Sequence, residues 1–93
     1  MTGAPKDPPG DPIAIGLAAL AETLGEPRRG QRFLDLTGIG TDELRARAGD
    51  PVLLAGLIRF LEAHEPDLVT VAEALGIAPA DLVGARRTLE SEQ

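Results

Sequence analysis

Residues 50–64, DPVLLAGLIRFLEAH, are the stretch that decides the fold. The Asp50 carboxylate can cap a helix, and Pro51 suits the first helical turn, where no N–H is required. The residues that follow are apolar around roughly half of a helical wheel. A helix with so wide an apolar stripe must be surrounded by other helices. The stretch therefore predicts a central helix, residues 51–64, in the core of a small helical domain.

Similar signals along the rest of the chain predict five further helices. Acid–proline pairs at residues 11–12, 26–27 and 65–66 are typical of helix starts, Thr41 is expected to cap a short helix that ends at Gly49, and Pro79 begins the last one. The other predicted helix terminators are Gly25, Gly38 and Gly76. No segment has the period-two alternation of a strand. The predicted fold class is all-α, a compact six-helix domain.

The domain organisation follows from composition and from a repeated pattern. Residues 1–10 combine proline and glycine with almost nothing apolar and are expected to form a disordered tail, followed by a single domain at 11–90 and a frayed end at 91–93. The acid–proline pairs at 11–12 and 26–27 recur 39 residues later. Two three-helix repeats, 11–49 and 50–90, would explain this spacing, and so would chance reuse of the same capping chemistry.

Composition excludes several classes of protein. The 93 residues include no cysteine, so disulfides and thiolate metal sites are impossible, and no apolar run is long enough for a membrane span. The N-terminus lacks the features of a signal peptide, which predicts a cytoplasmic protein. The net charge of −6 disfavours nucleic acid and anionic lipid as partners. One lysine against eight arginines is typical of a GC-rich bacterial gene.

Residues suited to catalysis are nearly absent from the chain. The single serine, Ser91, lies in the expected frayed end, and the carboxylates are scattered over outward faces. The single histidine, His64, falls on the apolar side of the central helix, where capping or packing is the expected role. The sequence therefore predicts no enzyme, no cofactor and no metal site.

An arginine cluster is the leading candidate for a binding face. Cations in the first turns of the helix that begins at 26–27 oppose the helix dipole, so their presence suggests another role. The predicted interaction face consists of Arg28, Arg29, Arg32, Arg45 and Arg47. It could bind an acidic protein segment or a phosphate, or it could be a solvated face paired with nearby carboxylates. An apolar groove near Ile15 and Val83 is a second candidate for docking.

Residues 68–85, LVTVAEALGIAPADLVGA, match the shape of a helix-turn-helix. The chemistry fits DNA poorly, because the first two turns of the second helix offer no side-chain donor and Asp81 would repel phosphate. Arg86 and Arg87 follow too late to read base edges, although they could contact phosphates. Structural packing is the favoured interpretation, and nucleic-acid binding through this segment is the alternative.

The chain also resembles a known family, the small alphaproteobacterial proteins grouped as domain of unknown function 3572. The resemblance covers residues 13–89 and rests on motifs spread along that range. The matching positions are Arg32-Phe33-Leu34, Leu36-Thr37-Gly38, Glu43-Leu44-Arg45, Asp50-Pro51, Phe60-Leu61, Gly76-Ile77, Pro79 and Ala85-Arg86. The resemblance implies a cytoplasmic all-α protein and assigns no activity. By elimination, the sequence favours a protein-interaction module, with the identity of the partner and the oligomeric state left open.

Overall fold

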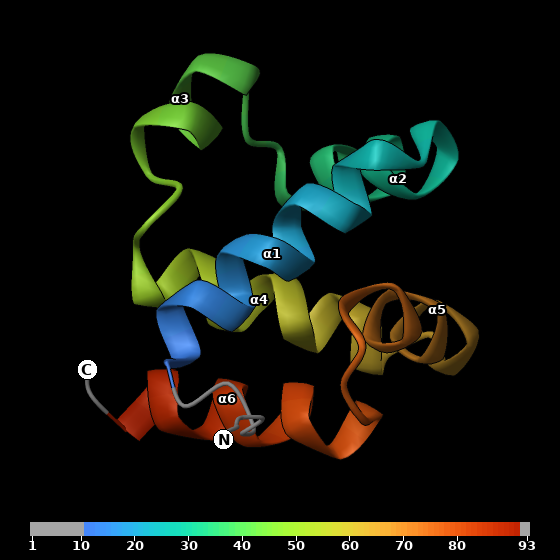
Figure 1. Ribbon diagram of the computed structural model, residues 1–93. Coiled ribbons are helices and arrows are strands. Elements are labelled where there is room, and N and C mark those ends of the chain that lie inside the picture. The colour runs from blue at the N-terminus through green and yellow to red at the C-terminus, as the bar shows by residue number, and fades with distance from the viewer. Residues whose placement is uncertain (1–10, 92–93) are drawn as a thin grey trace.

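The computed structural model describes residues 11–91, and six helices contain most of them (Figure 1). The helices are α1 (Pro12–Gly25), α2 (Pro27–Thr37), α3 (Thr41–Ala46), α4 (Pro51–Glu62), α5 (Glu65–Leu75) and α6 (Pro79–Ser91). Within these residues there is no strand, which confirms the all-α, six-helix prediction. The expected tail at 1–10 and the last two residues of the expected frayed end lie outside the described residues.

Acidic side chains begin three of the helices in the way that the sequence predicts. Oδ1 of Asp11 accepts a hydrogen bond from the N–H of Ile13 at 3.0 Å, and Oδ1 of Asp50 accepts one from Val52 at 2.9 Å. Glu26 does the same for α2 through the N–H of Arg29, at 2.8 Å. Each carboxylate satisfies one of the N–H groups that the first helical turn leaves without a partner.

Glycines in the left-handed conformation end α2 and α5. Gly38 has a φ of 71° and Gly76 a φ of 73°, values that side chains with a Cβ rarely adopt. The N–H of Gly38 donates to the carbonyl of Leu34, and that of Ile77 reaches back to Ala72. These bonds close the last turns of the two helices, so both predicted terminators are confirmed.

The predicted bounds of α3 are wrong at both ends. Gly40, rather than Thr41, occupies the cap position, and no side chain caps the helix. Thr41 is already helical, and α3 ends at Ala46, before the predicted stop at Gly49. Asp42 and Glu43 lie in the first turn, where the helix dipole favours negative charge in place of a side-chain cap.

α4 is the central helix, and it packs against α1, α5 and α6 (Figure 1). Four of its side chains, Leu54, Leu57, Ile58 and Leu61, are completely buried. The predicted range of 51–64 is two residues too long, because α4 ends at Glu62 and residues 63–64 form the turn into α5. At Gly16 of α1, an added Cβ would lie only 3.0 Å from Cβ of Leu54, so the glycine allows α1 to approach α4 closely.

The proposed pair of three-helix repeats is not confirmed. α6 has 13 residues and lies along α4, whereas its counterpart in the first half, α3, has only six. α3 makes little helix-to-helix contact with α1, the counterpart of α4. A helix of fewer than two turns cannot present the apolar face through which α6 packs. The two halves share the chemistry of their helix ends but differ in their packing.

Candidate functional site

The predicted arginine face does not exist as a single exposed surface. Arg29 is 8% exposed, and its Nη2 donates to the carbonyl oxygen of Glu22 in the last turn of α1 at 2.6 Å. Its Nε is buried and has no hydrogen-bond partner among the described residues. α1 carries no basic residue in its own last turn, so the Arg29 guanidinium supplies positive charge at that end. The prediction that Arg29 is available to a partner is wrong.

Arg32, on the next turn of α2, is held by two other helices. Its Nη2 forms an ion pair with Oδ2 of Asp67 in α5. The guanidinium carbon also lies 5.4 Å from the ring centroid of Phe60, and this ring packs edge-on against Phe33 at 5.4 Å. Arg32 therefore joins α2 to α4 and α5, although half of its side chain remains exposed.

The remaining arginines of the predicted face are exposed to different degrees. Arg47 is bound on both sides, to Glu43 at 3.4 Å and to Asp50 at 3.0 Å. Arg45 is 81% exposed and lies 3.8 Å from Asp42, a spacing at which a surface pair contributes little. Arg28 is exposed, and no described residue pairs with it. Arg28 and Arg45 are thus the members of the predicted face with charge free for a partner.

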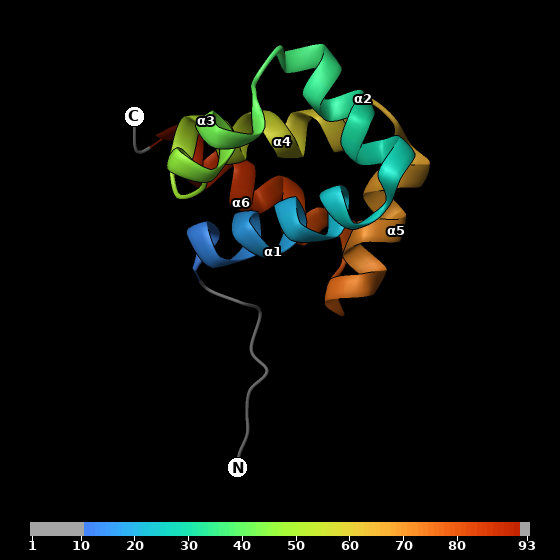
Figure 2. The same cartoon turned by 90° about the horizontal axis from the view of Figure 1, so that it is seen from above.

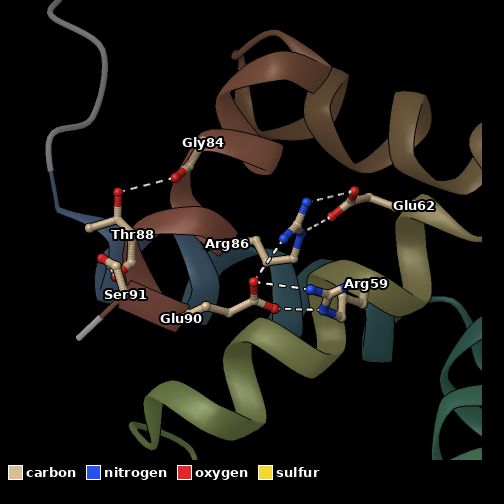
Figure 3. A network of polar contacts seen from close by, with 7 residues as sticks. All are labelled: Arg59, Glu62, Gly84, Arg86, Thr88, Glu90 and Ser91. Atoms are coloured by element: carbon tan, nitrogen blue, oxygen red, sulfur yellow. Dashed lines mark hydrogen bonds and ion pairs between the residues drawn. The ribbon is translucent and has the colours of Figure 1, made fainter. Parts of the chain in front are cut away.

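Arg86 is the centre of an ion-pair network that joins α6 to α4 (Figure 3). Its Nε donates to Oε2 of Glu62 at 2.5 Å and its Nη1 to Oε1 of Glu90 at 2.9 Å, with 12% of the side chain exposed. Glu90 also accepts from Arg59 at 2.5 Å. The hydrogen bond from Arg59 is the main cause that lowers the pKa of Glu90, and the bond to Glu62 raises the pKa of Arg86.

This network corrects two predictions. Arg86 is not free to contact nucleic acid, since its donors are used within the fold, whereas Arg87 is exposed. The expected frayed end at 91–93 is also wrong at its first residue, because α6 continues to Ser91, and Glu90 just before it is anchored to α4. Arg86 and Glu62 are 24 residues apart in the chain, and Arg59 and Glu90 are 31 residues apart, so no local sequence pattern indicates either ion pair.

His64 lies in the turn between α4 and α5 and is exposed. Its exposure rules out the expected packing on the central helix, and among residues 11–91 its side chain forms no hydrogen bond to the last carbonyls of α4 and no cap of α5, so the expected role is wrong. α4 ends at Glu62, so His64 lies outside the helix, and the helical wheel that placed it on the apolar side does not apply to it. Among residues 11–91, no group of three histidines or carboxylates is placed to hold a metal ion.

The outer side of α1 is the surface with the clearest features of a docking site. Figure 2 shows α1 at the edge of the molecule, with α4 and α6 on one side of it only. Its exposed residues Ala14, Leu17, Ala18 and Ala21 follow a helical i, i+3, i+4, i+7 spacing and form one stripe. We call these four residues the α1 stripe. α1 carries no charged side chain before Glu22, so the stripe is uncharged along its length.

Two apolar hollows flank the α1 stripe. One, of about 160 Å³, is lined by Ala14, Ile15, Ala18, Leu75 and Ile77. The other, of about 300 Å³, is lined by Leu20, Leu24, Thr41, Leu44, Arg45 and Ala48. We call them the α5-side hollow and the α3-side hollow. The apolar surface therefore extends from α3 across α1 to the turn between α5 and α6.

The predicted groove near Ile15 and Val83 is only partly present. Ile15 is 6% exposed, so it belongs to the core and does not offer an apolar side chain to solvent. A hollow of about 270 Å³ does lie between the start of α1 and α6, and it is lined by Pro12, Ile15, Ala80, Asp81, Gly84, Ala85 and Thr88. Sequence reasoning missed the α1 stripe, although the uncharged run from Pro12 to Ala21 is the signal that could have revealed it.

No single described helix is long and apolar enough to span a membrane; α5 and α6 reach that length and composition only as a pair, with a bend of 96° between them. No curated protein and no solved structure matches the chain. The family described as "Protein of unknown function (DUF3572)" matches residues 10–92, nearly the whole sequence. The six-helix fold agrees with what the resemblance in the sequence implies. The chain belongs to the DUF3572 family.

Proposed function

We propose that this protein is an interaction module without catalytic activity, and that its protein partner docks on the α1 stripe. The exposed apolar face of α1 is the observation that carries the proposal. Leu17 is 38% exposed on a helix with no charge before Glu22. Exposed apolar surface bordered by hollows is characteristic of protein-binding sites, because a partner can bury it and exclude water.

The titratable groups of the structure support a non-catalytic role. The pKa of the Asp50 carboxyl and that of the Glu90 carboxyl are both displaced downward. For Asp50 the main cause is the hydrogen bond from the N–H of Val52. A general acid that works near neutral pH needs the opposite displacement, which burial or a like charge produces.

Nucleic-acid binding is a second candidate with weaker support. The bend of 96° between α5 and α6 lies within the roughly 90–120° range of helix-turn-helix pairs. Against it, Arg86 is bound to Glu62 and Glu90, and Asp81 uses its carboxylate to accept from the N–H of Ala78 at the start of α6. Arg87 alone leaves little positive charge for phosphate on this helix.

Affinity capture with a tagged chain tests the proposal. Wild type and a Leu17→Glu variant are compared with Leu36→Glu as a control, since Leu36 is 76% exposed and lies outside the α1 stripe. We expect a protein retained at low and high salt by the wild type and the control, and lost by Leu17→Glu. Capture that Leu17→Glu leaves intact would refute a docking site on α1. Nucleic acid retained only at low salt, and lost in an Arg87→Glu variant, would support the second candidate.

A further inference from the structure

The α3-side hollow has the size and the walls of a small-molecule site. α1 and α3 make little direct contact, and this hollow of about 300 Å³ is lined by residues of both helices. Leu20 and Leu24 come from α1, and Leu44 and Ala48 come from α3 and the turn after it. Leu20 and Leu44 are buried, so packing in the core fixes the positions of both walls. Small-molecule sites are mostly apolar clefts of roughly 300–1,000 Å³ with a few polar groups, and this hollow lies at the lower end of that range.

Two hydrogen-bond donors lie on the α3 wall of the same hollow. Thr41 and Arg45 both line it, and their spacing of four residues places them on one face of α3. Among residues 11–91, the Thr41 hydroxyl forms no hydrogen bond, and the Arg45 guanidinium has only its loose pairing with Asp42 at 3.8 Å. The Asp42 side chain is fully exposed, and such a surface pair contributes little. Both donors are therefore available to a ligand that enters the hollow.

The combination of a hydrocarbon wall and two donors fits one class of ligand. A carboxylate accepts hydrogen bonds on two oxygens, so it can bind a hydroxyl and a guanidinium at once. An alkyl chain attached to it would displace water from the leucine side chains. An amine would be repelled by Arg45. A doubly charged phosphate would meet one arginine with the Asp42 carboxylate close by, which balances too little of its charge.

We propose that the α3-side hollow binds an aliphatic monocarboxylic acid, with its carboxylate at Thr41 and Arg45. The alkyl chain lies between the two walls, against the leucines of α1 and α3. The bound acid fills the space between these helices and joins them. This inference goes beyond the docking of a protein on the α1 stripe and does not depend on it.

NMR titration of the isotope-labelled full chain with butanoate, hexanoate and octanoate tests the proposal. We expect saturable shifts of the backbone amides of α3 and of the second half of α1. Each added methylene should tighten binding about fourfold, because it buries further apolar surface. Shifts that appear instead at Leu75 and Ile77, which line the α5-side hollow, would refute the assignment of the site. The absence of saturable shifts with all three acids would refute a ligand site altogether.

Substitutions at the rim test the role of charge. Arg45→Gln should weaken octanoate binding about two- to fivefold and leave the binding of uncharged octanol unchanged, since only the ion pair is lost. Asp42→Asn should tighten octanoate binding, because it removes the competing carboxylate. Both side chains are exposed, so neither replacement should unfold the protein. An affinity for octanoate that both variants leave unchanged would refute the carboxylate site.

A second pair of variants tests the hollow itself. Ala48→Leu should fill it and abolish octanoate binding, whereas Ala18→Leu, which fills the α5-side hollow instead, should leave binding intact. Equal affinities in the two variants would contradict the site.

N-acetylleucine, which resembles the C-terminal residue of a protein, distinguishes a free acid from a peptide end. Tighter binding of N-acetylleucine than of hexanoate would overturn the proposal in favour of a peptide ligand. Leu17 does not line this hollow, so the affinity capture with Leu17→Glu tests the proposed function separately.

Discussion

Replacing Gly16 by alanine tests the close approach of α1 and α4, with Gly56 as a matched control. Both glycines lie within helices. A Cβ at Gly16 would lie 3.0 Å from Cβ and 3.1 Å from Cδ1 of Leu54, a residue that is completely buried. A Cβ at Gly56 would have no heavy atom within 4 Å. The same substitution therefore adds a methyl group to a tight contact in α1 and to open space in α4.

Two opposing free energies decide the result at Gly16. Alanine favours a helix interior over glycine by about 1 kcal/mol, and this gain applies at both positions. Carbon atoms prefer separations of roughly 3.5–4.0 Å, so the contact at 3.0 Å requires a shift of about 0.5 Å. Cβ of Leu54 is fixed to the backbone and cannot rotate away, and overpacking of this kind costs about 1–3 kcal/mol. We expect Gly56→Ala to gain about 1 kcal/mol, and Gly16→Ala to be about 1–3 kcal/mol less stable than Gly56→Ala.

Urea and thermal unfolding followed by far-UV circular dichroism measure both variants, since the chain has neither Trp nor Tyr. For a domain of this size, 1 kcal/mol corresponds to a change in Tm of about 4–8 °C. The urea m value should stay constant, so that a change in midpoint reports stability alone. Equal stabilisation by the two substitutions would show that α1 and α4 separate without cost and that the tight contact is not a constraint.

Three further predictions concern the core, a helix terminator and the ion-pair network. Phe33 is 1% exposed, so Phe33→Ala should cost about 3–5 kcal/mol in the free energy of unfolding; a Tm within a few degrees of wild type would contradict this. Gly76 has a φ of 73° and open space around it, so Gly76→Ala should cost about 1–2 kcal/mol in urea unfolding, with Gly76→Asn costing less. Because the Arg59 hydrogen bond lowers the pKa of Glu90 below its ordinary 4.5, the network stabilises the fold above that pH and loses this effect as the pH falls through the lowered pKa. The Tm difference between wild type and Glu90→Gln should therefore shrink on acidification, and a difference that persists in acid would argue against this role.

The sequence predicts the helix ends well because their chemistry is local. Asp11 and Asp50 reach N–H groups two residues away, and Gly38 and Gly76 need only their own backbone conformation. The start of α3 is an exception, since its first turn has no side-chain cap and Thr41 resembles one by composition alone; the end of α4, two residues before the predicted one, is another.

The candidate site was harder to predict because it depends on contacts between distant residues. Arg32 pairs with a carboxylate 35 residues away, and Arg86 with one 24 residues away. A helical wheel cannot show that these charges are used within the fold. The α1 stripe was missed because an apolar helix is ordinarily assigned to the core. Only the packing of the helices shows which side of α1 remains exposed.

The corner between α1 and α2 has a consequence for local unfolding. Arg29 of α2 donates to the carbonyl of Glu22, and a Cβ at Gly30 would lie 3.2 Å from Cα of Leu24. The last turn of α1 is therefore completed by the first turn of the next helix. Amide protons at the end of α1 should exchange with solvent deuterium at the rate at which α2 detaches, so that the two helices open as one cooperative unit.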